Sequence, residues 1–121
     1  MTAQEVINVF ETMLTQDEQQ LLKDTILYGS WGDCDKEFRN ENGDVETVSA
    51  WGYCTNDAHR GGHFKGRQIA TMFRSIYRKL CPDKHMGRYM AQCHDWWGDG
   101  TGDMLFLRDD FTNEYYKWAK H

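Results

Sequence analysis

The chain has 121 residues, of which 40% are apolar and 14% are aromatic, and it contains a single proline. This length and composition argue against a disordered chain and predict one domain, residues 1–121, with a hydrophobic core. No apolar run approaches the ~20 residues that a membrane-spanning helix needs, and the N-terminus lacks the basic and apolar pattern of a secretion signal. We therefore expect a soluble, cytoplasmic protein that does not contact membranes.

The net charge of −5 hides a strong asymmetry along the chain. Residues 1–58 carry three basic and twelve acidic side chains, whereas residues 59–90 carry eight basic side chains and a single acidic one, Asp83. A split of this kind favours an anionic partner, or the docking of one part of the protein on another. The expected partners are therefore nucleic acid or another polyanion, or an acidic protein.

Two Thr-x-x-Glu capping boxes predict two consecutive short helices at the start of the chain. Thr2 with Glu5, and Thr15 with Glu18, would each satisfy free amides at a helix N-terminus. An apolar stripe follows each box, and Gly29 favours the end of the second helix.

Residues 30–55 show strand-like alternation around Asn42-Gly43, a dipeptide typical of a two-residue type I′ hairpin turn. In that register Cys34 pairs with Trp51, and Cys34 and Cys54 lie on opposite faces, where they could share neither a metal nor a disulfide. The predicted core face carries Cys34, Phe38, Val45, Trp51 and Tyr53, and the predicted solvent face carries Trp31, Asp33, Asp35 and Glu37.

Residues 63–81 form the most strongly patterned helix, which Pro82 ends because proline disfavours helical geometry in the residue before it. At about 100° per residue, Arg67, Arg74 and Arg78 share one side of this helix. The opposite side is an apolar stripe that we expect to be buried. The stripe consists of Ile69, Met72, Phe73, Ile76, Tyr77 and Leu80.

Residues 87–108 predict a second hairpin, with arms at 89–93 and 104–107 and a turn at 98–103. A last helix begins near Asp110. The order is therefore two helices, hairpin, helix, hairpin, helix. We predict an α+β domain in which a four-stranded antiparallel sheet has its helices packed on one face.

The loop before the central helix, residues 58–67, is the strongest functional candidate. Its glycines let the backbone approach a ligand, and free amides at a helix start bind anions. Gly61 to Gln68 supplies G-x-x-x-x-G-R-Q in place of the P-loop pattern, so we exclude nucleotide hydrolysis by that mechanism. A glycine turn into a helix with a basic, solvated side is the simpler alternative. The predicted anion- or nucleic-acid-binding residues are Arg60, His63, Lys65, Arg67, Arg74 and Arg78.

Two alternatives concern how the arginine row is used. In a winged-helix arrangement the basic helix would contact nucleic acid and the second hairpin would be the wing, although Asp95, Asp99 and Asp103 there would repel phosphates. Alternatively, the arginines pair with the acidic face of the first hairpin.

A third set of residues has the chemistry of metal ligands. His59, His63 and His94 lie near a hairpin that is followed by a helix, an arrangement that resembles in outline the ββα-metal nucleases and implies a metal-dependent phosphodiesterase. The four cysteines form no C-x-x-C pair, so we expect free thiols. We predict no catalytic residue, no cofactor and no metal.

The sequence thus favours a small, non-enzymatic binding module that contacts a polyanion, nucleic acid above all, through its basic helix and its Gly/His loop. The alternatives are a protein–protein adaptor or homo-oligomeric interaction protein, and a metal-dependent phosphodiesterase or nuclease.

Overall fold

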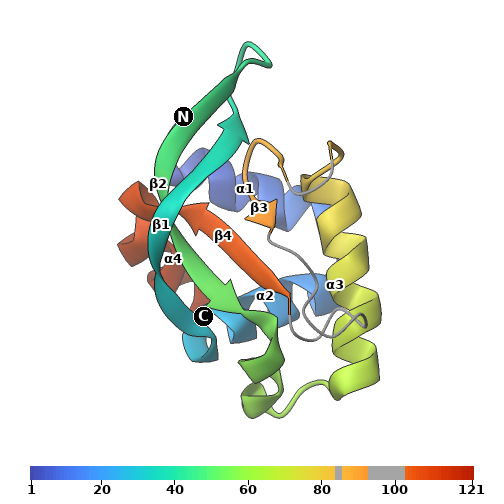
Figure 1. Cartoon of the computed structure of the whole chain (residues 1–121). Helices are drawn as coiled ribbons and strands as arrows, with labels where there is room; N and C mark the ends of the chain where they lie inside the picture. Colours follow the sequence, from blue (N-terminus) through green and yellow to red (C-terminus); the bar gives the residue numbers. More distant parts are fainter. Residues whose placement is uncertain (84–85, 93–102) are drawn as a thin grey trace.

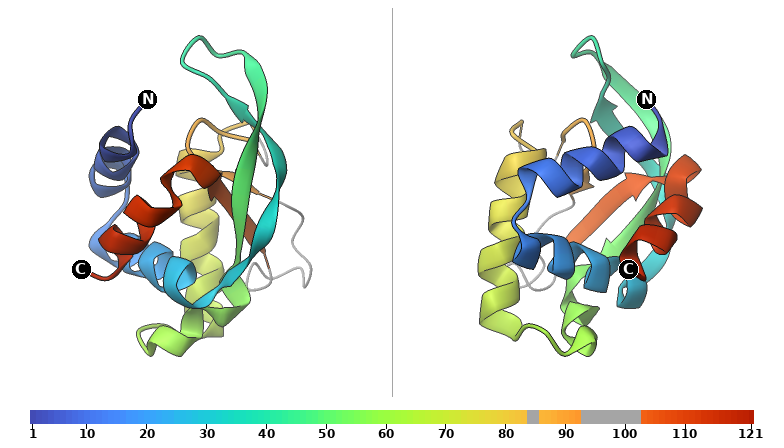
Figure 2. Two further views of the ribbon diagram at one scale, coloured as in Figure 1. Left: turned by 90° about the vertical axis from the view of Figure 1, so that its left-hand side faces the viewer. Right: turned by 180° about the vertical axis from the view of Figure 1, so that it is seen from behind.

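The structure, a computed structural model, describes residues 1–83, 86–92 and 103–121. An antiparallel sheet has helices packed behind it, and α3 lies on the side away from the β1–β2 hairpin (Figures 1 and 2). The predicted α+β class is confirmed. Among the described residues no helix combines the length and the apolar character needed to cross a membrane. The elements are α1 (Ala3–Met13), α2 (Gln16–Tyr28), β1 (Ser30–Arg39), β2 (Val45–Cys54), the 3₁₀ helix η1 (Thr55–Gly61), α3 (Gly66–Leu80), β3 (Ala91–Gln92), β4 (Met104–Arg108), the 3₁₀ helix η2 (Asp109–Phe111) and α4 (Thr112–Ala119).

Both N-terminal helices begin after the predicted threonines. At the start of α2, the Glu18 amide donates to Thr15 Oγ1 at 3.1 Å and the Thr15 amide donates to Glu18 Oε1 at 2.8 Å, so the second capping box is confirmed. At the start of α1, Thr2 Oγ1 accepts from the Glu5 amide at 3.2 Å. α2 ends immediately before Gly29, as predicted.

The prediction of a sheet with four full strands is wrong, because the predicted third strand is almost absent and three full strands form the sheet in the part of the chain that the structure describes. Within the described residues, β1, β2 and β4 are strands of 10, 10 and 5 residues, whereas β3 adds only residues 91–92 beside β4 in the order β1-β2-β4-β3. β3 begins so late because the chain turns just before it, where the Gly87 amide donates to the Met90 carbonyl oxygen at 3.0 Å. Of the predicted turn at 98–103, only Asp103 lies within the described residues.

The tip of the β1–β2 hairpin also differs from the prediction. The strands are one residue out of the predicted register, because the loop spans residues 40–44. The Gly43 amide donates to the Asn40 carbonyl oxygen at 3.0 Å, and Gly43 has a φ of 83°, an arrangement typical of a type I turn followed by a left-handed glycine. Asn40 Oδ1 also accepts from the Asp44 amide at 3.0 Å, which stabilises this wider loop.

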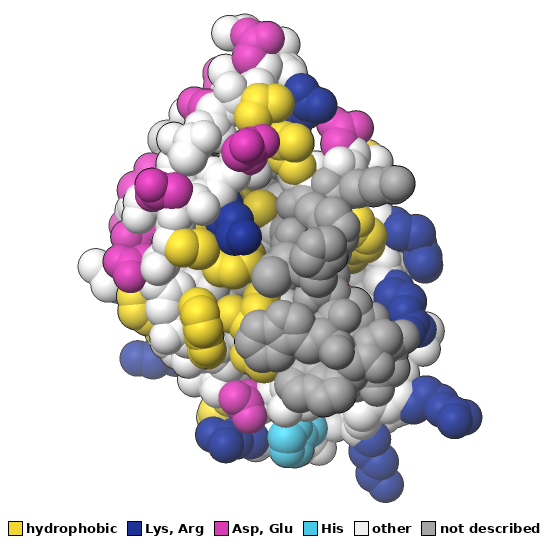
Figure 3. Space-filling model, viewed as in Figure 1, with side chains coloured by type: hydrophobic (Ala, Val, Ile, Leu, Met, Phe, Trp, Pro, Cys, Tyr) yellow, Lys and Arg dark blue, Asp and Glu magenta, His cyan; other side chains and the backbone are white. Residues whose placement is uncertain are grey.

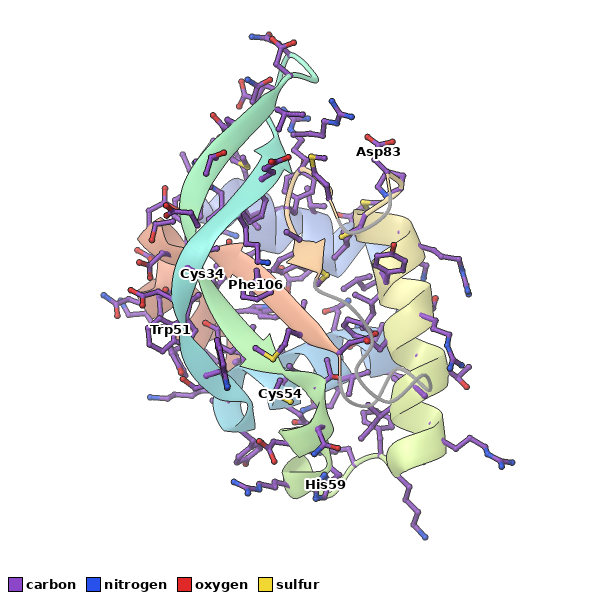
Figure 4. All side chains as sticks on the ribbon, in the orientation of Figure 1. Cys34, Trp51, Cys54, His59, Asp83 and Phe106 are labelled. Carbon is purple, nitrogen blue, oxygen red and sulfur yellow. The ribbon has the colours of Figure 1, made fainter. Side chains whose placement is uncertain are left out.

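The shifted register changes which side chains share a face of the sheet. Cys34 pairs with Ala50 and not with Trp51, so Cys34 and Cys54 lie on the same face and the predicted separation of the two thiols is wrong. Val45, predicted to be core, is 46% exposed. One face packs on the helices through Trp51, Tyr53, Leu105 and Leu107, and the other carries a second cluster of Phe38, Ala50, Ala91, Met104 and Phe106, with Cys34, Val48 and Cys54 packed against it (Figure 4).

α3 buries its predicted apolar stripe in the main core, together with side chains from α1, α2, α4 and the sheet. Burying its four largely inaccessible side chains contributes on the order of 6–12 kcal/mol before the entropy cost of ordering them. This burial fixes the rotation of the helix, so its basic side must face outward. The stripe comprises Ile69, Phe73, Ile76 and Leu80, which are buried, and Met72 and Tyr77, which are half-buried. α4 adds Tyr115 and Trp118 to the same core.

Candidate anion-binding face

The outward side of α3 carries the predicted row of arginines. Arg67, Arg74 and Arg78 are exposed. Within the described residues, no acidic side chain lies within the 4.0 Å of an ion pair from any of the three. Figure 3 shows acidic side chains gathered on the side of the β1–β2 hairpin and basic ones along α3. The alternative in which the arginines pair with the acidic side chains of β1 is therefore wrong.

An open hollow of about 470 Å³ lies between η1 and the first half of α3. Its polar lining comes from both elements, with Asn56 and His59 on η1 and Arg67, Thr71 and Arg74 on α3. The three α3 residues are four and three positions apart, which places them on one side of the helix. The hollow therefore brings together two guanidinium groups, a hydroxyl, an amide and an imidazole. Gly66, Ile69 and Ala70 complete its lining.

The imidazole of His59 has a defined orientation. Its Nδ1 lies 2.7 Å from the carbonyl oxygen of Asn56, one turn earlier in η1. Because a carbonyl oxygen only accepts, Nδ1 must carry the hydrogen of this bond. Nε2 then carries a lone pair that can accept a hydrogen bond in the neutral ring, and it carries a hydrogen that it can donate in the protonated ring. Figure 4 places His59 at the end of the molecule where α3 begins.

His63, predicted to bind an anionic ligand, instead contacts a carboxylate of the protein itself. Its Nδ1 lies 3.1 Å from Oδ2 of Asp24, a side chain of α2 that is 2% exposed. Gln20 Nε2 donates to the other oxygen of the same carboxylate at 2.9 Å. Gly61 is required here, since a Cβ atom on it would lie 2.5 Å from the Asp24 carboxylate. His63 therefore holds the loop before α3 against α2.

The two remaining predicted basic residues, Arg60 and Lys65, are not among the residues that line the hollow. Arg60 forms an ion pair with Asp57 in η1, with Nη2 and Oδ1 3.6 Å apart and the arginine side chain 63% exposed. Lys65 is exposed and directly precedes α3, where its amide donates to Gln68 Oε1 at 3.1 Å. Arg60 thus has a partner within the protein, whereas the Lys65 ammonium is presented to solvent.

Lys79, although basic and on α3, does not belong to the outward row. Its Nζ donates to Oε1 of Glu18 at 2.5 Å. Burial opposes ionisation of Glu18, but hydrogen bonds from Lys79, Ser75 and the Thr15 amide outweigh it, so the pKa of Glu18 is lowered. This pair joins the end of α3 to the start of α2 and leaves Lys79 committed to the fold.

The possible metal ligands do not gather in the part of the chain that the structure describes, where no group of three or more His, Cys, Asp or Glu side chains could hold an ion. Cys34, Cys54 and Cys81 are free. Burial raises the pKa of Cys81 to about 12 and also raises that of Cys54, so both are poor nucleophiles at neutral pH. Cys93 and His94 lie outside the described residues. The metal-dependent phosphodiesterase stays a prediction from the outline of the hairpin and helix.

The sequence predicted the loop and the arginines but not Asn56 and Thr71 as lining residues, and it named His59 as a possible metal ligand and as part of the Gly/His loop without naming it as an anion-binding residue. The signal for Thr71 was its position between Arg67 and Arg74 on the helical wheel. Nothing in residues 55–61 predicts that they form a 3₁₀ helix beside α3.

No model of a known protein family matches the chain, and no curated protein and no solved structure matches it either.

Proposed function

We propose that the protein is a small binding module whose outward α3 face contacts a polyanion, above all nucleic acid. The observation that supports this proposal is the charge at the N-terminal end of α3. The peptide dipoles give that end a partial positive charge, so a cation there costs ~0.3–1 kcal/mol of helix stability. Lys65 and Arg67 both stand there, and the first turn contains no acidic residue to offset them. An anion beside this end would reverse the cost, because it would attract the side chains and the free amides together.

The rest of the row points to the same kind of ligand. Arg74 and Arg78 are four residues apart on one side of α3, where like charges destabilise a helix by ~0.2–0.5 kcal/mol. Arg67 and Arg74 are about 10 Å apart along the helix axis at 1.5 Å per residue. A row of unpaired guanidinium groups over this length suits a chain of phosphates, since arginine forms paired hydrogen bonds to phosphate oxygens.

Phosphate contacts orient a nucleic acid without reading its sequence. We therefore expect binding that depends on charge and length and little on base sequence. The cytoplasmic location predicted from the sequence is part of this proposal.

The test is fluorescence anisotropy with a labelled single-stranded oligonucleotide at low salt. Arg67→Glu/Arg74→Glu should weaken binding about 100-fold, because each charge-assisted hydrogen bond contributes ~1.5–3 kcal/mol. The matched control, Lys117→Glu/Lys120→Glu, makes the same charge change at two exposed lysines, one on α4 and one directly after it, and should change affinity far less. Equal losses in the two double variants, or no binding by the unmodified protein, would remove the proposal.

A second candidate is an adaptor that meets an acidic protein or a second copy of itself. It is favoured by the exposed acidic side chains Asp33, Asp35 and Glu37 of β1. Figure 3 shows acidic side chains gathered on the side of the molecule away from the basic ones along α3. Such polarity permits head-to-tail contact between copies. Light scattering at low salt should then show association that Arg67→Glu/Arg74→Glu abolishes. A monomer at every salt and protein concentration would exclude the self-association form.

A further inference from the structure

We infer that the hollow between η1 and α3 binds one phosphate group of the polyanion through Arg67, Arg74 and the protonated form of His59, so that phosphate binding takes up a proton. This inference rests on the proposed function and adds to it the ligand group, the position at which it is held and a dependence on pH.

The arginine side chains are placed to meet on one ligand. Although their backbones are seven residues apart, Arg67 and Arg74 line the same hollow, with the Thr71 hydroxyl between them. Neither guanidinium group has an acidic partner among the described residues, so both are free to bind. A tetrahedral phosphate has enough oxygens to accept from two guanidinium groups and a hydroxyl at once.

His59 supplies the opposite wall and the pH dependence. The Asn56 carbonyl oxygen occupies its Nδ1–H, so Nε2 is the nitrogen left for a ligand. In the neutral ring Nε2 has a lone pair, which repels a phosphate oxygen. In the protonated ring it donates a hydrogen bond and adds positive charge. Histidine is the side chain that makes this change between about pH 5 and 8.

The other charged groups around His59 are accounted for on each packed element. On η1 itself, Asp57 is paired with Arg60. On the α2 side, Asp24 is paired with His63. On α3, the charged side chains that line the hollow with His59 are Arg67 and Arg74. Among the residues that the structure describes, no carboxylate lines the hollow to compete with a phosphate for the protonated imidazole.

The phosphate could be an internal one of the nucleic acid chain or a terminal monoester. Two oligonucleotides of the same sequence, with and without a 5′-phosphate, separate these sources. Tighter binding of the phosphorylated oligonucleotide identifies the terminal group, and equal binding identifies a backbone phosphate.

The decisive experiment measures oligonucleotide affinity from pH 5.5 to 8 at constant salt. The unmodified protein should lose about tenfold in affinity over this range, the worth of one hydrogen bond to a charged group. His59→Gln should bind at every pH with the affinity that the unmodified protein has at pH 8. His59→Lys, which stays charged, should retain the high affinity at every pH. His121→Gln, a change at the exposed C-terminal histidine, is the control and should keep the full pH dependence.

Different results would overturn the phosphate site and the binding of a polyanion. If His59→Gln keeps the pH dependence of the unmodified protein, the inference is wrong even though Arg67→Glu/Arg74→Glu abolishes binding. If the double arginine variant binds as well as the unmodified protein, the proposed function fails and the inference fails with it. Thermal melts of both His59 variants at pH 7 would show whether they remain folded, and His59→Lys alone decides the matter if His59→Gln does not fold.

Discussion

The helices α2 and α3 begin in chemically opposite ways. α2 starts with a complete capping box and has Asp17 and Glu18 in its first turn, where negative charge is favourable. α3 starts with Lys65 and Arg67 and has no acidic residue in its first turn. Basic residues are favourable only in its last turn, which contains Arg78 and Lys79. The start of α2 is therefore arranged for the stability of the fold, whereas the start of α3 opposes it. Sites that break a local rule in this way are where function is expected.

The lysines and arginines of α3 show the same difference side by side. Lys79 is committed to Glu18 of α2 and so contributes to the fold. Arg67, Arg74 and Arg78 have no such partner among the described residues. Their positive charge is thus available to a ligand, and each group can be altered separately to test which purpose it serves.

The largest effect on stability is expected from Lys79→Met, which breaks the contact between the two helices. It leaves the carboxylate of Glu18, whose side chain is 6% exposed, without its charged partner. We expect a loss of ~2 kcal/mol in the free energy of unfolding, measured by urea denaturation at pH 7. Lys117→Met on α4 is the exposed control and should have little effect. A loss no larger than that of the control would show that the Glu18–Lys79 pair contributes nothing.

The contribution of the Glu18–Lys79 pair to stability should also depend on pH. The pKa of folded Glu18 is lowered from its ordinary value of 4.5, so its carboxylate stabilises the fold above pH 4.5, and this stability is lost as the pH falls through the folded pKa. The stability difference between the unmodified protein and Lys79→Met should therefore shrink on acidification below about pH 4. A constant difference down to pH 3 would contradict this assignment.

A smaller and opposite effect is expected from Arg67→Glu. Replacing a cation by an anion in the first turn of α3 should raise the free energy of unfolding by ~0.5–1 kcal/mol at low salt. Arg78→Glu is the matched control, because the same charge change in the last turn should lower stability. Both changes should weaken oligonucleotide binding. An Arg67→Glu variant that is less stable than the unmodified protein would mean that Arg67 serves the fold.

The sequence predicts α3 well because its signal is local. Six apolar side chains recur at helical spacing, and burying Ile69, Phe73 and Ile76 leaves the arginines only one direction to face. The capping box at Thr15 is equally local. Where two local signals compete, prediction fails: Asn42-Gly43 favours a two-residue turn, but Asn40 binds the amides of its own loop and shifts the hairpin by one residue.

The sequence predicts the α3 side of the hollow but not the η1 side, because the position of η1 depends on contacts between residues far apart in the chain. The arginines follow from one helix, but the hollow needs η1 to lie beside α3, and that arrangement involves long-range contacts such as the one between His63 and Asp24, which are 39 residues apart. His63 therefore has a structural role that its position in a basic, glycine-rich loop does not reveal.

The most direct test of the central claim is the salt dependence of oligonucleotide binding. If Lys65, Arg78 and the pair of Arg67 and Arg74 together neutralise three phosphates of a single strand, the logarithm of the association constant should fall with the logarithm of salt concentration with a slope of about −2. The slope should become shallower by about one or more in Arg67→Glu/Arg74→Glu. A slope near zero, or one that the double variant leaves unchanged, would contradict the assignment of this face to a polyanion.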